Sequence, residues 1–444
     1  VWMPINARSG SDEVKVMLEK FVPRVVFYDP SLSSIVESYR AVAPTSVEFV
    51  VLEREQVEAW IGQQGDAPLD QRFDEHAVYA VQPTGGTTGV PKGVQFTHKN
   101  AEYVALSFEA ICPFTPTSRN PRPVLLASAP LSHAAGQVMQ LIMRQGGLCV
   151  ISNQPIAELP RIIDEHAVTH MFVPPTVIYG LIDLPHIHSY NYDSLQYMLY
   201  GAAPISPVKL GQAVSIFGPV LAQIYGQTET GVPNLYLAPQ DHFRDGDPAN
   251  GIADASRLGA AGRPTPLIDM AIIDDDGQPV VQGERGEIAV KGFSVSPGYD
   301  GDPEATAESM KGEWFLTGDV AFEDDEGFVH IVARKKEFII TGGFNVYSAE
   351  VERALLAQEG VQECAVFGVP DEKWGEAVVA VLEPVSGVAI DVAAVTAGVK
   401  EMLGSVKTPK HLEVTDTLPR TPTGKVFKRE IRATYLQRHG LQTA

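Results

Sequence analysis

Residues 195–229 of this chain are LQYMLYGAAPISPVKLGQAVSIFGPVLAQIYGQTE. The apolar runs Leu195–Tyr200 and Val220–Tyr225 predict two strands, and the amphipathic stretch Ser206–Phe217 between them predicts a helix. This strand–helix–strand order is typical of a parallel sheet covered by helices on both faces. A short loop follows each strand at its carboxyl end, which is the edge where such sheets bind ligands.

The same alternation extends over the first two-thirds of the chain. We expect further strands at Arg24–Tyr28, Val124–Ala129, Gly147–Ser152 and Val168–Val173, and a helix at Ile156–His166. From about Leu267 the pattern changes to short strands separated by Asp/Gly turns: Ile268–Ile273, Gly286–Lys291, Gly327–Ala333 and Phe338–Thr341. This pattern predicts an antiparallel, barrel-like subdomain.

A third pattern occupies the C-terminal residues. It consists of a helix, two strands and a second helix, at Ser348–Leu356, Val361–Val369, Glu376–Pro384 and Val392–Leu403. The predicted fold class is therefore α/β, with a large N-terminal region of doubly covered, largely parallel sheets, the barrel-like subdomain, and a small α+β C-terminal domain. We expect an N-terminal domain over 1–335 and a mobile C-terminal domain over 336–444, with residues missing before Val1.

Composition excludes several classes of function. A length of 444 residues suggests two or three domains. A formal net charge of −21 argues against a nucleic-acid partner, which needs a basic face. The chain has no run of about 18 apolar residues, so we expect no membrane span. Cys112, Cys149 and Cys364 are isolated in sequence, which favours a reducing, cytoplasmic location.

Residues 84–93, TGGTTGVPKG, have the composition of a phosphate-binding loop. Glycines let backbone N–H groups turn toward an anion, threonine hydroxyls add donors, and Lys92 adds a positive charge. The flanking runs 77–81 and 93–97 predict two short strands. The ordinary P-loop does not fit, because Pro91 precedes the lysine and a glycine follows it. A glycine-rich hairpin without a ligand is the alternative interpretation.

Four further motifs accompany this loop. Tyr225–Glu229 follows a strand, Thr317-Gly318-Asp319 ends a predicted turn after Trp314, Arg334-Lys335-Lys336 precedes a Gly342-Gly343 pair, and Thr421-Pro422-Thr423-Gly424-Lys425 lies near the C-terminus. Each alone is weak, since a Thr-Glu pair is usually a helix cap and a Gly-Asp pair a turn. Together, in this order, they resemble the adenylate-forming superfamily, in its acyl-CoA synthetase branch. The resemblance covers almost the whole chain.

The resemblance implies substrates and site residues. The phosphates of ATP would be held by Thr84, Gly85, Gly86, Thr87, Thr88, Gly89 and Lys92, with Gly85 standing where serine is usual. The adenine would be lined by Gly201, Ala202, Ala203 and Pro204, with Tyr225 stacked on it and Gly226 and Gln227 beside it. Thr228 would contact the α-phosphate, Glu229 would hold Mg²⁺, and Asp319 would accept the ribose hydroxyls next to Arg334.

The implied chemistry needs no nucleophilic side chain. The substrate carboxylate would attack the α-phosphorus of ATP, and Lys425 would offset the repulsion between the two anions. The small domain would then swing about Lys336, replacing Lys425 with Gly342, Gly343 and Phe344 beside a tunnel for coenzyme A. His133 would lie near the substrate carboxylate, with a purely structural histidine as the alternative.

The segments Val173–Thr176 and Gly231–Pro233 would flank the acyl pocket, and their small or apolar residues favour a hydrophobic acid. We therefore expect a ligase that joins a fatty or aromatic acid to coenzyme A. One alternative is a stand-alone enzyme that loads a carrier protein, which the ligase-like Phe344–Tyr347 disfavours. The other is a luciferase-like or non-catalytic relative. The oligomeric state is open, a homodimer included.

Overall fold

The computed structural model describes residues 1–6, 9–65, 74–84, 92–132, 134–335, 338–421 and 424–441. Contacts within the chain divide it into two compact units. The first combines Val1–Glu102 with Ser296–Glu308, and the second combines Tyr103–Val295 with Ser309–Ala444.

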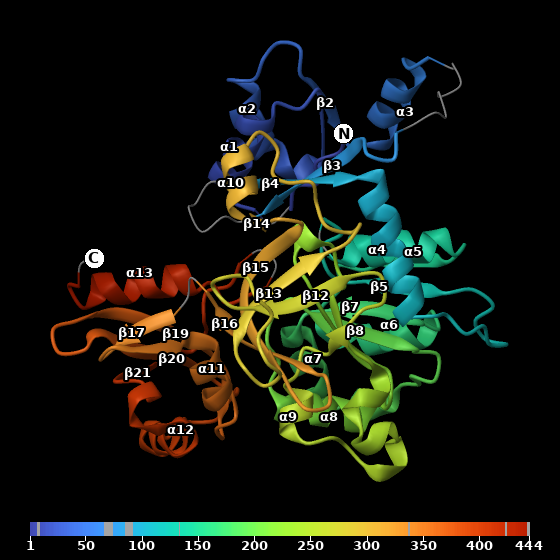
Figure 1. The fold of residues 1–444 in the computed structure, drawn as a ribbon. Helices are drawn as coiled ribbons and strands as arrows, with labels where there is room; N and C mark the ends of the chain where they lie inside the picture. Colours follow the sequence, from blue (N-terminus) through green and yellow to red (C-terminus); the bar gives the residue numbers. More distant parts are fainter. Residues whose placement is uncertain are drawn as a thin grey trace. The chain divides into compact units, whose positions relative to one another are not determined.

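The second unit contains a seven-stranded sheet, in the order β11-β10-β9-β8-β7-β5-β6; Figure 1 labels its strands β5, β7 and β8. Five strands are parallel: β5 (Val124–Ala127), β6 (Leu148–Ile151), β7 (His170–Val173), β8 (Tyr197–Gly201) and β9 (Leu221–Tyr225). Two short antiparallel strands, β10 (Leu235–Leu237) and β11 (Arg263–Pro264), extend the sheet beyond β9. The parallel strands predicted from the sequence are confirmed.

Helices cover both faces of this sheet, as predicted. One face packs against α6 (Leu159–Glu165), α7 (Pro175–Ile182) and α8 (Pro207–Phe217). The other face packs against α4 (His98–Ile111) and α5 (Ala134–Arg144). Helix α8 begins where predicted because the Ser206 side chain accepts a hydrogen bond from the Lys209 N–H and proline occupies the first turn.

A second, antiparallel sheet confirms the strand-rich region predicted from about Leu267. It contains β12 (Asp269–Ile273), β13 (Gly286–Lys291), β14 (Met310–Lys311), β15 (Trp314–Glu323) and β16 (Val329–Arg334). The assignment of Phe338–Thr341 to this region is wrong. This strand, β17, belongs to the C-terminal sheet. It pairs with β18 (Phe344–Tyr347), the next strand in the chain, and with β20.

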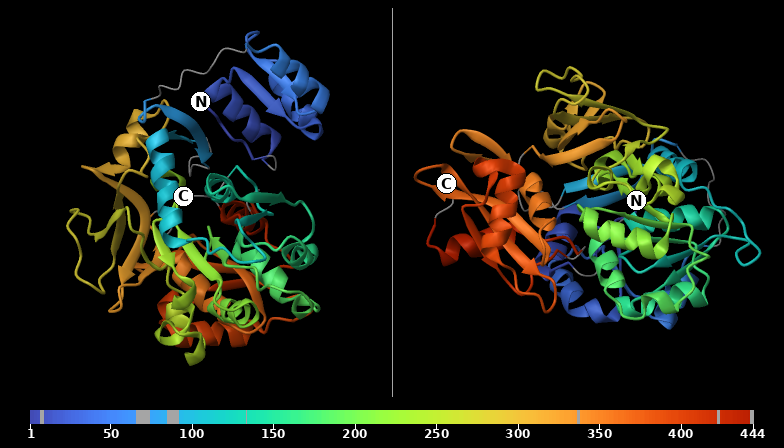
Figure 2. Two further views of the ribbon diagram at one scale, coloured as in Figure 1. Left: turned by 90° about the vertical axis from the view of Figure 1, so that its right-hand side faces the viewer. Right: turned by 90° about the horizontal axis from the view of Figure 1, so that it is seen from below.

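The C-terminal region forms the predicted α+β arrangement. Its sheet contains β17, β18, β19 (Val361–Asp371), β20 (Gly375–Pro384) and β21 (His411–Val414). One face buries apolar side chains against α11 (Ser348–Leu356) and α12 (Val392–Lys407), and the other face against α13 (Lys428–Arg438). The right-hand view of Figure 2 shows these orange and red elements gathered into one group. The domain boundary at residue 335 stays a prediction.

The first unit contains two small sheets. In one, β1 (Val25–Tyr28) pairs in parallel with β2 (Glu48–Val51), accompanied by α1 (Ser11–Phe21), α2 (Ser33–Arg40) and α3 (Arg54–Gly62). In the other, β3 (Val78–Thr84) and β4 (Lys92–Thr97) form the antiparallel pair predicted to flank the glycine-rich loop. Helix α10 (Pro303–Glu308) also belongs to this unit.

Candidate active site

The carboxyl ends of β8 and β9 meet at one edge of the large sheet. Gly201 pairs in register with Ile224, and a Cβ atom at Gly201 would lie 2.2 Å from the Ile224 carbonyl oxygen, so only glycine allows this approach. Gly201 is buried, whereas Ala202 and Pro204 are exposed. The fold thus brings Gly201–Pro204 beside Tyr225, as the parallel pairing predicted. Their contact with adenine stays a prediction.

The loop after β9 is held by a buried polar network. It forms a short 3-10 helix, Thr228–Thr230, in which the buried Thr230 hydroxyl donates to Asn234 Oδ1. Asn234 Nδ2 donates to the Gly231 carbonyl at 2.7 Å, and Ser294 Oγ donates to the Thr230 carbonyl at 2.9 Å. These hydrogen bonds involve the last residue of the short helix and the residues after it. Thr228 and Glu229, which precede them, stay partly exposed.

Asp319 lies at the centre of a polar cluster that joins the two sheets. Tyr225 Oη donates to Asp319 Oδ2 at 2.7 Å, and Arg334 Nε contacts Asp319 Oδ1 at 2.8 Å. Asp319 is only 4% exposed. Burial, with the Asp319 carboxylate as the next cause, raises the pKa of Tyr225 well above its ordinary value, so the phenol stays a donor. Sequence reasoning found these three residues but missed the Tyr225–Asp319 hydrogen bond.

Thr317-Gly318-Asp319 lies inside β15, so the prediction that it ends a turn is wrong. Between the pairs Glu287–Val320 and Ala289–Leu316, β15 has three intervening residues where β13 has one. The extra residues form a bulge, in which Gly318 has φ of 73°. Two bonds fasten it: Thr317 Oγ1 donates to the Ile288 carbonyl at 2.8 Å, and Gln227 Nε2 donates to the Thr317 carbonyl at 3.1 Å.

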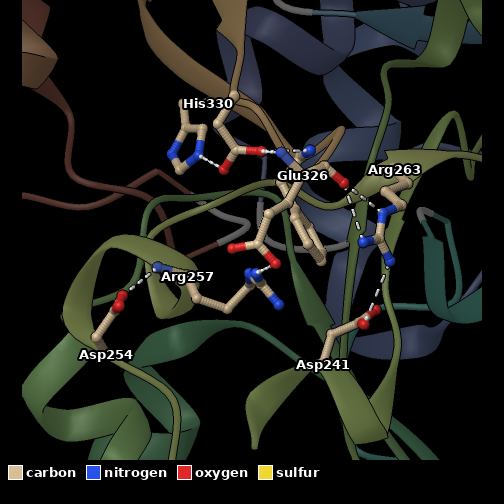
Figure 3. A network of polar contacts seen from close by, with 8 residues as sticks. Asp241, Asp254, Arg257, Arg263, Glu326 and His330 are labelled. Carbon is tan, nitrogen blue, oxygen red and sulfur yellow. Dashed lines mark hydrogen bonds and ion pairs between the residues drawn. The ribbon is translucent and has the colours of Figure 1, made fainter. Parts of the chain in front are cut away.

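The β15–β16 hairpin that carries Asp319 and Arg334 is also fastened at its turn (Figure 3). The guanidinium groups of Arg257 and Arg263 lie 3.7 and 3.8 Å from the centre of the Phe328 ring. Arg257 pairs with Glu326, and Arg263 pairs with Asp241. His330 Nε2 contacts Asp324 Oδ2 at 2.8 Å. Asp319 pairs in register with Arg334 at the far end of this hairpin, so these contacts and the Asp319–Arg334 pair belong to one continuous hairpin.

Lys425 lies within the electrostatic influence of this cluster. Desolvation lowers its pKa, Arg334 lowers it further, and Asp319 acts in the opposite direction. Lys425 is nevertheless exposed to solvent, so the surrounding protein removes part of its hydration without enclosing it. The Thr421 N–H donates to the Lys425 carbonyl at 2.7 Å and holds the loop in a hairpin. The catalytic role of Lys425 stays a prediction.

Three of the predicted site segments lie partly outside the described residues. For the phosphate loop, the structure describes Thr84 and Lys92, which pair across the β3–β4 hairpin, and the Lys92 ammonium group lies 4.7 Å from the centre of the Tyr299 ring. The remaining loop residues, Gly85, Gly86, Thr87, Thr88 and Gly89, are outside the described residues, as are His133 and Lys336.

Gly342 and Gly343 form the two-residue turn between β17 and β18, with φ of 58° and 81°. The next residue, Phe344, is 61% exposed. Sequence reasoning missed the neighbour of this turn, Trp374, whose carbonyl accepts the Gly342 N–H at 2.7 Å. Lys373 and Lys410 place their ammonium groups 4.6 and 5.4 Å from the centre of the Trp374 ring. The available signal was a tryptophan within the polar and glycine-containing stretch 372–376.

Two negative findings apply to the described part of the chain. It contains no group of three or more His, Cys, Asp or Glu side chains arranged to hold a metal ion. Among the same residues, every helix is too short or too polar to cross a membrane.

Comparison with known proteins gives matches along most of the chain. The AMP-binding enzyme family matches residues 1–300, and the C-terminal domain of AMP-binding enzymes matches residues 350–425. The medium/long-chain-fatty-acid–CoA ligase FadD8 of Mycobacterium tuberculosis is 40% identical over 84% of this chain and 63% of its own length. The feruloyl-CoA synthase of an Amycolatopsis species is 34% identical over 97% of this chain and 83% of its own length.

A solved structure, ATP-bound MatB from Rhodopseudomonas palustris, is similar with a TM-score of 0.85 and 28% identity. The similarity covers 98% of this chain and 84% of that one.

Proposed function

Because the chain belongs to the AMP-binding, adenylate-forming family of enzymes, we propose that it is an ATP-dependent acid–CoA ligase. It activates a hydrophobic carboxylic acid, fatty or aromatic, as an acyl-adenylate. It then transfers the acyl group to coenzyme A and releases AMP. The observation that carries this proposal is the buried Asp319 carboxylate, held by Tyr225 and Arg334 within the influence of Lys425.

Asp319 suits the ribose of ATP. Each of its carboxylate oxygens already accepts one hydrogen bond or ion pair, from Tyr225 and from Arg334, and a carboxylate oxygen has a second lone pair. The Asp319 carboxylate accepts the two ribose hydroxyls as charge-assisted hydrogen bonds. The adenine then lies along the exposed residues that follow Gly201.

In the first half-reaction, a carboxylate oxygen of the acid forms a bond to the α-phosphorus, and the bond from that phosphorus to pyrophosphate breaks. Lys425 offsets the repulsion between the two anions and stabilises the charge that develops on the α-phosphate. Thr228, on the short helix after β9, donates its hydroxyl to the same phosphate.

The donor set fits Mg²⁺, which binds through one or two carboxylates together with substrate phosphates. Glu229 is the partly exposed carboxylate beside Thr228 that would hold the ion. When bound, Mg²⁺ neutralises phosphate charge and makes pyrophosphate a better leaving group.

In the second half-reaction, the sulfur of coenzyme A attacks the acyl carbon of the adenylate, and the bond from that carbon to the AMP oxygen breaks. The exposed Phe344 and the Trp374 ring, with Lys373 and Lys410 beside it, offer stacking and positive charge to a nucleotide-bearing thiol.

The small or apolar residues of Val173–Thr176 and Gly231–Pro233 support a hydrophobic acid, with His133 near its carboxylate. The three unpaired cysteines support a cytoplasmic location.

The test is product analysis by mass spectrometry. The protein is incubated with ATP, Mg²⁺ and coenzyme A, and with a panel of medium- and long-chain fatty acids and aromatic acids. We expect an acyl-CoA and AMP in equal amounts. A parallel incubation offers an acyl carrier protein, because one relative is named a fatty acid–[acyl-carrier-protein] ligase. Loading of the carrier protein without any acyl-CoA would favour a carrier-protein ligase over a coenzyme A ligase. Absence of AMP with every acid would refute both of these functions.

A further inference from the structure

Glu287 is an acidic residue beside the apolar run of strand β13. It lies on β13, followed by Ile288, Ala289 and Val290, which are fully buried, and it is itself only 8% exposed. A buried carboxylate is costly unless it is paired. Its oxygens have partners: Oε1 accepts the Gly318 N–H at 2.9 Å, and Oε2 contacts Lys335 Nζ at 3.1 Å.

Both partners of Glu287 are next to residues of the candidate site. Gly318 precedes Asp319 on β15, and Lys335 follows Arg334 at the end of β16. A third bond closes the arrangement, because the Lys335 N–H donates to the Gly318 carbonyl at 2.6 Å. Glu287 therefore binds the residue before Asp319 and the residue after Arg334, and so contacts the immediate sequence neighbour of each member of this pair.

The bulge at Gly318 makes this support necessary. In a regular ladder the partner strand would hold each peptide group, but β13 offers one residue against three in the bulge. The Gly318 N–H would then have no hydrogen-bonding partner in the ladder. Gly318 itself has φ of 73°, a value that glycine adopts readily but that is unfavourable for most other residues. The Glu287 carboxylate supplies the missing acceptor.

We propose that Glu287 is a positioning residue that acts through Gly318 and Lys335 to hold Asp319 in place for the ribose hydroxyls of ATP. This role rests on the proposed function. It differs from a general contribution to stability, because it makes Glu287 responsible for ribose recognition without any contact between Glu287 and the nucleotide.

The experiment compares Glu287→Gln with the wild type. Glutamine keeps the size of the side chain and an oxygen for the Gly318 N–H, but its amide group cannot pair with the Lys335 ammonium group. Binding of ATP, 2′-deoxy-ATP and 3′-deoxy-ATP is measured by titration calorimetry, which does not depend on turnover. The wild type should prefer ATP, and Glu287→Gln should reduce this preference by roughly tenfold, which corresponds to one weakened charge-assisted hydrogen bond.

Three further variants locate the effect. Lys335→Gln removes the other half of the ion pair and should also reduce the preference for ATP. Asp275→Asn is the matched control, since Asp275 is the exposed second partner of Lys335, at 2.7 Å, and its loss leaves the bond from Glu287 to Gly318 intact. This control should keep the wild-type preference. In an Asp319→Asn background, Glu287→Gln should have no further effect on ribose discrimination.

Thermal unfolding and the Michaelis constant for the acid accompany each variant. If Glu287→Gln retains the wild-type ribose discrimination, or weakens ATP and both deoxy analogues equally, Glu287 has only a structural role and the proposal is overturned. A wild type without ribose discrimination also overturns it. Acyl-CoA formation by the wild-type protein, measured on the same preparation, reports separately on the proposed function.

Discussion

Asp319 and Lys425 carry the most specific chemistry at the scale of single residues. Asp319 is buried and has a cationic and a neutral donor, whereas Lys425 is exposed and its pKa is lowered. A buried carboxylate that is held in place by two donors is suited to recognition of hydroxyl groups. A partly desolvated ammonium group interacts strongly with developing negative charge, because fewer water molecules screen it.

Replacing Asp319 by alanine should raise the Michaelis constant for ATP by about 10- to 100-fold, because hydrogen bonds to a charged group contribute roughly 1.5–3 kcal/mol. The Michaelis constant for the carboxylic acid should change little. Steady-state kinetics with each substrate varied in turn measures both values. Unchanged dependence on ATP would leave Asp319 as a structural residue of the bulge.

Lys425→Ala should lower the rate of adenylation by about 10²–10³-fold, the usual cost of removing one preorganised group that stabilises transition-state charge. Thioester formation from a supplied acyl-adenylate should continue at the parental rate. The assays are exchange of pyrophosphate into ATP and release of AMP from the adenylate. Lys400→Ala, on the exposed face of α12, is the matched control. Parental pyrophosphate exchange in Lys425→Ala would refute the assignment.

The lowered pKa of Lys425 predicts a pH dependence. The side chain is charged below its pKa and neutral above it. Adenylation should therefore decline as the pH rises through a value lower than that of an ordinary lysine. Rates of pyrophosphate exchange across the alkaline range measure this decline. In Lys425→Arg the guanidinium group stays charged, so whatever activity remains should lack the alkaline decline; a decline at the same pH in both proteins would assign it to another group.

At the scale of elements, the hairpin that carries Lys425 is anchored at its base by Glu383 on β20. The Leu418 N–H donates to Glu383 Oε2 at 2.7 Å, and Arg420 Nη2 donates to Oε1 at 3.1 Å. Glu363 lies close by on β19, and burial raises its pKa to about 7, with Arg420 among the groups that oppose this rise. Arg420 thus fastens the first residues of the hairpin to the sheet.

Arg420→Gln should lower adenylation by roughly tenfold, because one charge-assisted contact at the base of the hairpin is lost. Thioester formation from a supplied acyl-adenylate should be nearly unchanged. The matched control is Arg438→Gln, which breaks a comparable ion pair with Glu413 on the same domain. Equal losses in the two half-reactions would show that Arg420 stabilises the domain without positioning Lys425.

At the scale of the whole molecule, polar groups join the C-terminal region to the antiparallel sheet. Arg353 Nη2 on α11 donates to the Ile331 carbonyl on β16 at 3.0 Å, and Arg285 lies 3.7 Å from Glu350. A polar contact of this kind can separate at modest cost, since water replaces the lost hydrogen bonds. Lys335 is held by Glu287 and Asp275, so the chain is fixed up to that residue. This supports a pivot that begins at Lys336.

Lys336→Pro should separate the two half-reactions. Proline fixes φ near roughly −65° and restricts the preceding residue, so it should block one of two required conformations. We expect pyrophosphate exchange to continue while acyl-CoA formation collapses. Both half-reactions are assayed separately, with thermal unfolding as the control. Equal damage to both steps would contradict a pivot at this position.

Much of the architecture was predictable because it depends on local patterns. The strands at 197–201 and 221–225 and helix α8 were predicted from apolar runs and an amphipathic pattern, which act within a few residues. Phe338–Thr341 was assigned to the wrong sheet because the Gly342-Gly343 pair was not interpreted as a hairpin turn that joins it to Phe344–Tyr347. The Thr317–Asp319 bulge was taken for a turn, since glycine and aspartate favour both and only the register with β13 distinguishes them.

The sequence by itself determined the family and the fold class, because glycine-rich loops and short polar motifs are contiguous in the chain. It also supplied the candidate site residues, whose roles stay predictions. Only the tertiary structure decided how those residues are held. The Tyr225–Asp319 hydrogen bond joins residues 94 positions apart, and the bond from Gly318 to Glu287 joins residues 31 apart. Such contacts depend on the register of strands in a closely packed sheet, and a shift of one residue would turn each side chain to the opposite face.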